Sequence, residues 1–359
     1  LFDISLRRSI FLIQTVTHTS YLMLLYFYFK EIKLNIIQLF ALYAPIFLLY
    51  PLAELEVLGR KEIILFLFFL TTIFFSAKKY DAKIINYLVF FISPIVCLMW
   101  ELVIFFFPFF AAVLIIKNNL KTFKEVLQKL SIIFAPAIIT FTYIFFTPLS
   151  DSGHQVMCSF LNNEFSEQCY MSANMLITST IYFDTLFIHQ NANFENYLRY
   201  TLIILIGFLP LNILVSKSNF IIKNNFITKN FKLSSLFILL YSPSLFLFVF
   251  GYDWGRWINI TYTFSILFYM YLLKNLIITN RLKIKNLTFN KIVKNKILLS
   301  FIFIIFAFSW NPKTVMMGDV ATNSAYKIIY NTSKKIFDFK GIRLFQDNPI
   351  IKFHKNYIE

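Results

Sequence analysis

Charge is scarce in this chain of 359 residues: Asp, Glu, Lys and Arg make up 14% of it, whereas hydrophobic residues make up 58%. A soluble core does not need so much apolar surface, and the run from Ile63 to Phe75 carries no charge at all. The alternation of a membrane β-barrel is also missing. These absences exclude a soluble globular domain and a barrel, and they predict a multi-pass helical membrane protein.

Glycine and cysteine are rare, with 7 and 3 copies. The chain has neither a phosphate-binding loop nor a G-x-G-x-x-G fingerprint, which opposes a nucleotide-binding fold. The 4 histidines, at positions 18, 154, 189 and 354, are scattered, and we interpret none of them as paired with a cysteine at zinc-site spacing. We therefore expect no metal site and no cofactor.

Apolar stretches of about 15 to 21 residues recur along the chain, close to the length that spans a bilayer. They predict an all-α fold, a polytopic transmembrane helix bundle of about ten spans within residues 1–310. The predicted spans lie near 9–29, 34–53, 63–77, 84–99, 101–116, 130–147, 201–216, 233–250, 257–273 and 297–310.

The stretch from Ile84 to Ile116 is open to three interpretations: two short helices, one long tilted helix, or a re-entrant pair. Pro94, Pro108 and the polar break at Trp100-Glu101 favour a hairpin.

Basic residues are distributed unevenly between the predicted loops. The segments 30–33, 78–83, 117–129, 217–232 and 274–296 hold 20 Lys/Arg and 3 Asp/Glu, while 54–62, 99–101, 148–200 and 251–256 hold 4 and 10. The positive-inside rule then predicts that the basic set is cytoplasmic and the other set periplasmic. The net charge of +16 is thus explained by topology and contact with membrane lipids, and nucleic acid is not an expected partner.

Both ends of the chain leave a question open. Ten spans place the polar tail 311–359 in the periplasm, although it carries 8 Lys/Arg and 4 Asp/Glu, so a missed span is the alternative. The chain starts at Leu1 with no cleavable signal pattern before the first span. This suggests a fragment with helices missing upstream.

The largest predicted periplasmic loop runs from about 148 to 200. Cys158 and Cys169 lie in it, and in an oxidising compartment we expect them to form a disulfide; unpaired thiols are the alternative. Cys97 falls inside a span and is expected to be a small buried residue. The apolar segment 175–187 suggests an interfacial or re-entrant helix, either a lid over a site or packing filler.

Three motifs of mixed charge share the predicted periplasmic face. They are Glu54 to Glu62, Trp100-Glu101, and Gly251 to Trp257, which contains Asp253-Trp254-Gly255-Arg256-Trp257. Charge beside membrane helices is costly, so these motifs are the candidate functional site. Simpler explanations are solvated turns, tryptophans as interfacial anchors, and local ion pairs of Arg256 with Asp253 or of Arg60 with Glu56. Gly59 is expected to permit a tight turn.

The side chains of these motifs suit a phosphorylated lipid-linked sugar. Arginine binds phosphate oxygens through a planar fork, carboxylates act as general base or stabilise an oxocarbenium-like transition state, and indoles offer flat faces to sugars. The candidates are, for the diphosphate, Arg60, Lys61 and Arg256; for catalysis, Glu56, Glu101 and Asp253; and for sugar stacking, Trp100 and Trp254.

With a Gly-Arg-Lys-Glu turn, a Trp-Glu before an aromatic run and a proline, a large outer loop and a late Asp-Trp-Gly-Arg-Trp turn, the chain resembles O-antigen and exopolysaccharide polymerases of the Wzy/EpsG kind. The resemblance covers roughly residues 30–275. It implies a bacterial inner-membrane enzyme that transfers a growing glycan from undecaprenyl diphosphate to another lipid-linked repeat unit, without nucleotide sugar or metal.

The resemblance also implies that Arg60 and Arg256 hold the diphosphate, and that a chain-length regulator is a partner. One departure is that Arg199 is the only arginine in the large loop, where typical members often have more.

Two other functions compete with a polymerase. A many-helix glycosyltransferase that uses lipid-phosphosugars needs an acidic pair in its first outer loop, and Glu54-x-Glu56 is a passable match. A lipid or oligosaccharide transporter is the non-enzymatic alternative, but transporters tend to bury charge at mid-membrane and to show repeated halves, which this sequence does not.

Overall fold

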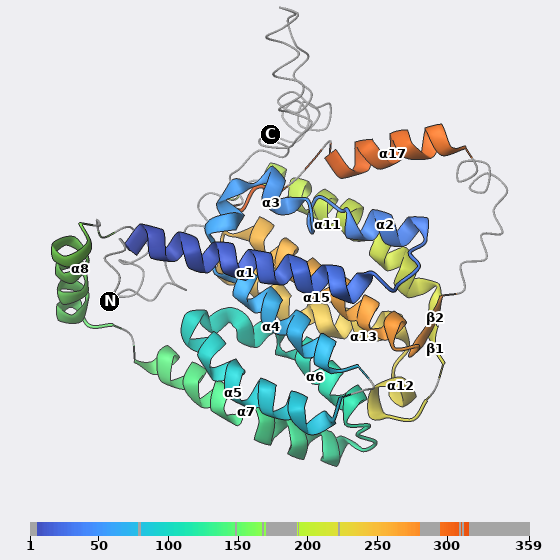
Figure 1. Ribbon diagram of the computed structural model, residues 1–359, viewed down its shortest axis with the longest axis horizontal. Coiled ribbons are helices and arrows are strands. Elements are labelled where there is room, and N and C mark those ends of the chain that lie inside the picture. The colour runs from blue at the N-terminus through green and yellow to red at the C-terminus, as the bar shows by residue number, and fades with distance from the viewer. Residues whose placement is uncertain are drawn as a thin grey trace, which may run out of the picture.

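The computed structural model describes residues 6–77, 80–147, 149–166, 169, 192, 194–221, 223–280, 295–308, 310 and 312–315. These residues are mostly helical, as the predicted all-α class requires, and one short two-stranded sheet is present among them (Figure 1). Five helical stretches are long and apolar enough to cross a membrane, namely Arg8–Phe29, Ala82–Met99, Phe123–Phe146, Asn196–Ser216 and Leu233–Phe250. They indicate a membrane protein.

The structure contains the following helices and strands, in the order of the sequence. They are α1 (Leu6–Phe29), α2 (Ile36–Leu42), α3 (Tyr50–Ala53), the 3₁₀ helix η1 (Leu55–Gly59), α4 (Glu62–Phe75), α5 (Ala82–Met99), η2 (Glu101–Phe106), α6 (Phe107–Lys117), α7 (Phe123–Phe146), α8 (Asp151–Phe165), α11 (Phe194–Ser216), β1 (Ser218–Phe220), α12 (Phe226–Asn230), α13 (Leu233–Tyr241), η3 (Ser242–Ser244), α14 (Leu245–Phe250), α15 (Trp254–Lys274), β2 (Ile278–Asn280) and α17 (Lys296–Phe308).

Helix α15 is the centre of the bundle (Figure 1). It packs against α4, α6, α11 and α14, and nearly all of its side chains are buried. Its polar side chains bond to neighbouring backbone: Asn259 Nδ2 donates to Ile46 O at 2.9 Å, and Tyr262 Oη donates to Ala41 O at 2.8 Å. Such bonds are needed because a buried polar group without a partner costs free energy.

The predicted hairpin between Ile84 and Ile116 is confirmed. Helix α5 is followed at Trp100 by η2 and then by α6, which packs back against α5. Near the open end of the hairpin the amides of Asn86 and Asn118 donate to each other, at 3.0 and 2.9 Å. The start of α5 and the end of α6 are therefore at the same end of the bundle, as the hairpin requires.

The five predicted basic segments meet at one end of the bundle, which we call the basic end. Strands β1 and β2 pair antiparallel, with Phe220 opposite Ile278. Phe226 N donates to Leu120 O at 2.7 Å, and Lys117 Nζ donates to Ala77 O at 2.7 Å. Lys274 Nζ donates to Tyr28 O at 2.7 Å, which brings in the turn after α1. Segments distant in the sequence thus share one end.

The predicted span 34–53 is not one helix. Asn35 caps α2 through a reciprocal capping box with Gln38, but α2 ends at Leu42, and only the four-residue α3 follows at Tyr50. Pro45 lies just beyond the end of α2, and proline has no N–H to continue a helical hydrogen-bond ladder. The stretch is apolar, but the prediction of one continuous span over 34–53 is wrong.

Two more predicted spans have different boundaries. The stretch 101–116 begins as the 3₁₀ helix η2 and becomes α-helical only at Phe107. The span 130–147 begins earlier, at Phe123, because the Thr122 side chain accepts a hydrogen bond from Glu125 N at 3.2 Å. Lys124 and Lys129, which were expected in a loop, therefore lie on the first turns of α7.

Ten spans remain a prediction. Besides the five long stretches, the described part of the chain has two shorter apolar helices, Glu62–Phe75 and Lys296–Phe308. The segment 175–187 and nearly all of the tail 311–359 lie outside the described residues.

Candidate functional site

The three charged motifs lie at the end of the bundle opposite the basic end. Helices α4, α5 and α15 run between the two ends: Glu62, Met99 and Trp254 are at one end of these helices, and Phe75, Ala82 and Lys274 are at the other. The sequence therefore predicted correctly that residues 54–62, 99–101 and 251–256 come together, although more than 150 residues separate the first motif from the last.

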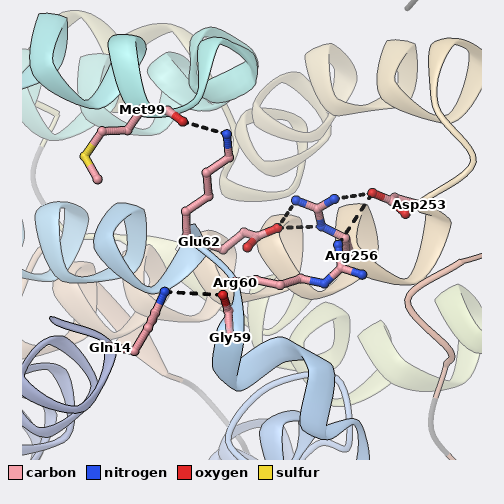
Figure 2. Close-up of polar contacts among 8 residues, drawn as sticks. Gln14, Gly59, Arg60, Glu62, Met99, Asp253 and Arg256 are labelled. Atoms are coloured by element: carbon pink, nitrogen blue, oxygen red, sulfur yellow. Dashed lines mark hydrogen bonds and ion pairs between the residues drawn. The ribbon is translucent and has the colours of Figure 1, made fainter. Parts of the chain in front are cut away.

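Arg256 is the centre of an ion-pair network at this end (Figure 2). Its guanidinium contacts the Glu62 carboxylate, with Nε 2.5 Å from Oε1, and it also pairs with Asp253 Oδ2. The same Asp253 oxygen lies 3.9 Å from Arg60 Nη1. One carboxylate is thus shared by two arginines. We call Arg60, Lys61, Glu62, Asp253 and Arg256 the ionic cluster.

Local structure explains how these side chains meet. The 3₁₀ helix η1 ends at Gly59, Lys61 precedes α4, and Glu62 is the first residue of α4. Asp253 precedes α15, so Arg256, three residues later, lies one turn along the helix beside it. Carboxylates at helix N-termini are also favoured by the helix dipole.

The ionic cluster is largely withdrawn from solvent. The exposed fraction of the side chain is 4% for Glu62, 13% for Arg256 and 17% for Asp253, against 26% for Arg60. Burial alone would lower the pKa of Arg256, but the charges and hydrogen bonds of Glu62 and Asp253 raise it above its ordinary value. Removing one partner of such a network leaves a buried charge uncompensated.

Lys61 connects the ionic cluster to the hairpin. Its Nζ donates to Met99 O, the last residue of α5, at 2.6 Å (Figure 2). Desolvation lowers the pKa of Lys61 below its ordinary value, and the negative charges of Glu101 and Glu62 oppose that effect. The negative charge of Glu101 therefore reaches the ionic cluster at Lys61.

The two candidate tryptophans are packing residues in this structure. Trp100 is 5% exposed and stacks on Trp257, with 6.0 Å between ring centroids, and on Phe106. Trp254 is 4% exposed, packs against Tyr200 and donates from Nε1 to Phe248 O at 3.0 Å. Their burial opposes the predicted sugar stacking, and it also opposes a role as lipid-facing anchors.

A second ion pair, which the sequence did not suggest, lies beside the cluster. Glu54, 1% exposed, pairs with Lys313 at 3.2 Å, and Tyr200 Oη donates to Lys313 O and Val315 O at 3.1 and 2.8 Å. Lys313 follows the last predicted span, and no local pattern indicates that it lies at this site. The segment 312–315 crosses this end of the bundle, and we call it the strap.

Glycine is required at position 255, where the strap crosses α15. A Cβ atom there would lie 1.7 Å from Lys313 O, a backbone atom. Gly59 has no such constraint, because no atom lies within 4 Å of the position that a Cβ would take and its φ is not positive. The tight turn expected at Gly59 is present as the end of the 3₁₀ helix η1, but its ordinary φ values do not require a glycine there.

Three buried polar atoms near the ionic cluster make no hydrogen bond within the described part of the chain. Among the described residues, Glu62 Oε2, Tyr50 Oη and Trp257 Nε1 are buried without a hydrogen-bond partner. Tyr50 Oη lies 3.1 Å from the position that a Cβ on Gly255 would take, which puts it under the strap. Unsatisfied buried groups are uncommon and point to water or a ligand.

The structure therefore gathers four of the predicted site residues, Arg60, Lys61, Asp253 and Arg256, and sets Glu101 next to them. The side chain of Glu56 is outside the described residues. The predicted pairing of Arg256 with Asp253 is present. Arg60 Nη1 lies 3.9 Å from Asp253 Oδ2, and the predicted pairing of Arg60 with Glu56 stays a prediction. Glu62 was missed as a site residue, although its place at the first position of an otherwise apolar run was a usable signal.

Away from this site, Cys158 and Cys169 form a disulfide, with Cα atoms 5.2 Å apart. The interpretation that no histidine pairs with a cysteine at zinc-site spacing is wrong. His154 is one helical turn before Cys158 on α8, and its Nε2 lies 3.4 Å from Cys158 Sγ. Candidate ligand atoms of His154, Cys158 and Cys169 lie within 4.8 Å of one another, but the disulfide occupies both sulfurs.

Comparisons with protein-family models, with curated proteins and with solved structures found no match to this chain.

Proposed function

We propose that the protein polymerises glycan repeat units linked to a polyprenyl diphosphate, at the end of the bundle that carries the ionic cluster. The observation that supports this most is the Asp253 carboxylate shared by Arg60 and Arg256. Two guanidinium groups converging on one anion form a site that fits a diphosphate, whose oxygens accept two-point hydrogen bonds from arginine.

In this proposal Asp253 occupies the anion position when no substrate is bound. A donor diphosphate, with more negative charge and more acceptor oxygens, displaces Asp253 from the two arginines. Glu62 continues to hold Arg256, since its Oε1 contacts Nε of that guanidinium, away from the Nη1 group that faces Asp253. The arginines thus stay oriented while one carboxylate is freed.

The freed carboxylate acts as general base. The acceptor sugar hydroxyl gives its proton to Asp253, or to Glu101 next to Lys61, and its oxygen forms a bond to the anomeric carbon of the donor glycan. The bond between that carbon and the diphosphate oxygen breaks, and its electron pair leaves with the polyprenyl diphosphate. Arg60, Lys61 and Arg256 stabilise the charge on this leaving group.

The location of the reaction forms part of the proposal. The basic end carries the lysine-rich segments and is assigned to the cytoplasm by the positive-inside rule, so the ionic cluster faces the periplasm of a bacterial inner membrane. Partners in this scheme are membrane lipids, an undecaprenyl-diphosphate-linked oligosaccharide and a chain-length regulator.

Two observations weaken the competing functions. Glu54, needed for an acidic pair in a glycosyltransferase that uses lipid-phosphosugars, is 1% exposed and pairs with Lys313. The middle of the central helix α15 carries uncharged polar side chains, such as Asn259 and Ser265, rather than the mid-membrane charges typical of transporters.

Replacing Arg256 or Arg60 by lysine tests the proposal. Lysine keeps the charge but cannot form the two-point contact, so each variant is expected to lose glycan chain extension by about 100-fold or more, the scale of one lost oriented donor. The measurement is the length distribution of lipid-linked glycan on gels, in cells that depend on this gene.

Arg8→Lys is the matched control, because Arg8 lies on α1 outside the ionic cluster and the exchange is chemically identical. It is expected to leave chain length unchanged. Membrane fractionation checks that every variant is inserted. Normal polymer length with Arg256→Lys or Arg60→Lys would show that the arginines do not hold a diphosphate.

A further inference from the structure

A cavity of about 420 Å³ opens at the basic end, far from the ionic cluster. It lies where three helices meet: α1 ends at Phe29, α4 ends at Phe75 and α15 ends at Lys274 (Figure 1). Its volume falls in the range of small-molecule sites. The lining residues are Phe27, Tyr28, Lys30, Glu31, Phe74, Ala77, Lys274 and Asn275.

The polar residues that line the cavity carry a net positive charge. Lys30 and Lys274 contribute two positive charges, Glu31 one negative charge, and Asn275 an amide. Lys274 Nζ is fixed in place, because it donates to Tyr28 O at 2.7 Å, lies 4.5 Å from the Tyr28 ring centroid and is 3.5 Å from Glu31 Oε2. The Glu31 side chain is 68% exposed, so it can swing away when a stronger anion binds.

Tyr28, one of the lining residues, has a buried hydroxyl. Tyr28 is 2% exposed, and its Oη has no hydrogen-bond partner among the described residues. A buried donor of this kind is normally satisfied.

The remaining wall is apolar and continues onto the outside of α1. Phe27, Phe74 and Ala77 line the cavity, and Met23 and Tyr26, which precede Phe27 on α1, are 54% and 66% exposed. A ligand bound here would contact lysine side chains at the end of the bundle and exposed apolar side chains of α1 beside them. Basic pockets between the cytoplasmic ends of membrane helices suit lipid headgroups.

We propose that this cavity binds the headgroup phosphate of an anionic phospholipid. The phosphate lies between Lys30 and Lys274 and takes the place of Glu31, the headgroup hydroxyls reach Asn275, and an acyl chain runs along the exposed face of α1. The proposal does not depend on the glycan chemistry at the ionic cluster.

The test is a titration of the whole protein in neutral detergent, followed by native mass spectrometry. Dioleoyl phosphatidylglycerol is expected to bind more tightly than dioleoyl phosphatidylcholine. Lys30→Gln with Lys274→Gln is expected to weaken phosphatidylglycerol binding about 25-fold, taking about fivefold for each lysine near a membrane surface. The matched control is Lys121→Gln with Lys229→Gln, two exposed lysines at the same end and outside the cavity, which is expected to bind as the wild type does.

Glu31→Gln is a second variant that keeps both lysines. It removes the competing carboxylate and is expected to strengthen phosphatidylglycerol binding by about fivefold. Unchanged binding in either the lysine pair or Glu31→Gln overturns the proposal, and if the lysine pair does not fold, Glu31→Gln decides alone. Displacement of the lipid by millimolar inorganic phosphate also overturns it, because the cavity would then be a site for free phosphate.

Discussion

The two ends of the bundle differ in how far their charged side chains are buried and in what those side chains contact. At the ionic cluster, Glu62 and Arg256 are 4% and 13% exposed, and their charges are matched by each other and by Asp253. At the basic end, Lys274 is 23% exposed and its acidic neighbour Glu31 is 68% exposed. Lysines there donate to backbone oxygens near helix ends, as Lys117 does to Ala77 O.

This difference separates two uses of charge in a membrane protein. Partly exposed lysines at helix ends can be exchanged at a lower cost than this network, since they are stabilised by water, by carbonyl oxygens and by the helix dipole. A compact, buried network is costly to assemble and more costly to break. The first arrangement fits orientation in the membrane, and the second needs a functional reason to persist.

The comparison is tested most severely by Glu62→Leu. The change leaves the Arg256 guanidinium buried with one partner fewer, and we expect it to lower the free energy of unfolding by roughly 3–5 kcal/mol. Unfolding in mixed detergent micelles, followed by circular dichroism, measures this. The double variant Glu62→Leu with Arg256→Met is expected to recover most of the loss, because it removes both charges; a double variant as unstable as the single one would contradict this account.

A smaller effect is expected from Gly255→Ala. The new Cβ would collide with Lys313 O, so the strap 312–315 must move, at a cost of about 1–3 kcal/mol. The same unfolding assay measures it. Gly59→Ala is the matched control at the same end, and since nothing lies near Gly59, stability should stay equal or rise slightly. Equal losses of stability in both variants would show that the strap does not pack against α15 at Gly255.

The smallest effect is expected at the basic end. Asn86→Ala and Asn118→Ala each break the reciprocal amide pair, which is half-buried, and each is expected to cost about 1 kcal/mol. A double-mutant cycle should show that the two losses are not additive, because both remove the same pair. Fully additive losses would mean that the amides do not bond to each other.

Helical class and the meeting of the charged motifs were predictable from the sequence because both follow from local patterns. Apolar runs fix where helices form, and the uneven lysine distribution fixes which loops share an end. That parity alone was enough to place Arg60, Glu101 and Asp253 in one region.

The features that could not be predicted from the sequence depend on contacts between residues that are distant in the chain. Glu54 and Lys313 are 259 positions apart, and neither position has a local pattern that names the other. The burial of Trp100 under Trp257 is likewise set by how two helices pack, so an indole that looked available for a sugar is covered. The break after Leu42 was readable from Pro45, but the apolar composition outweighed it.

The burial of α15 bears on how the protein is made. This helix is not among the five that are apolar enough to enter a bilayer by themselves, yet it is the most enclosed of those described. The helices that cover it, α4, α6, α11 and α14, all precede it in the chain. During synthesis α15 therefore emerges after the helices that surround it. Its Asn, Thr and Ser side chains can then pack directly between these helices without contacting lipid.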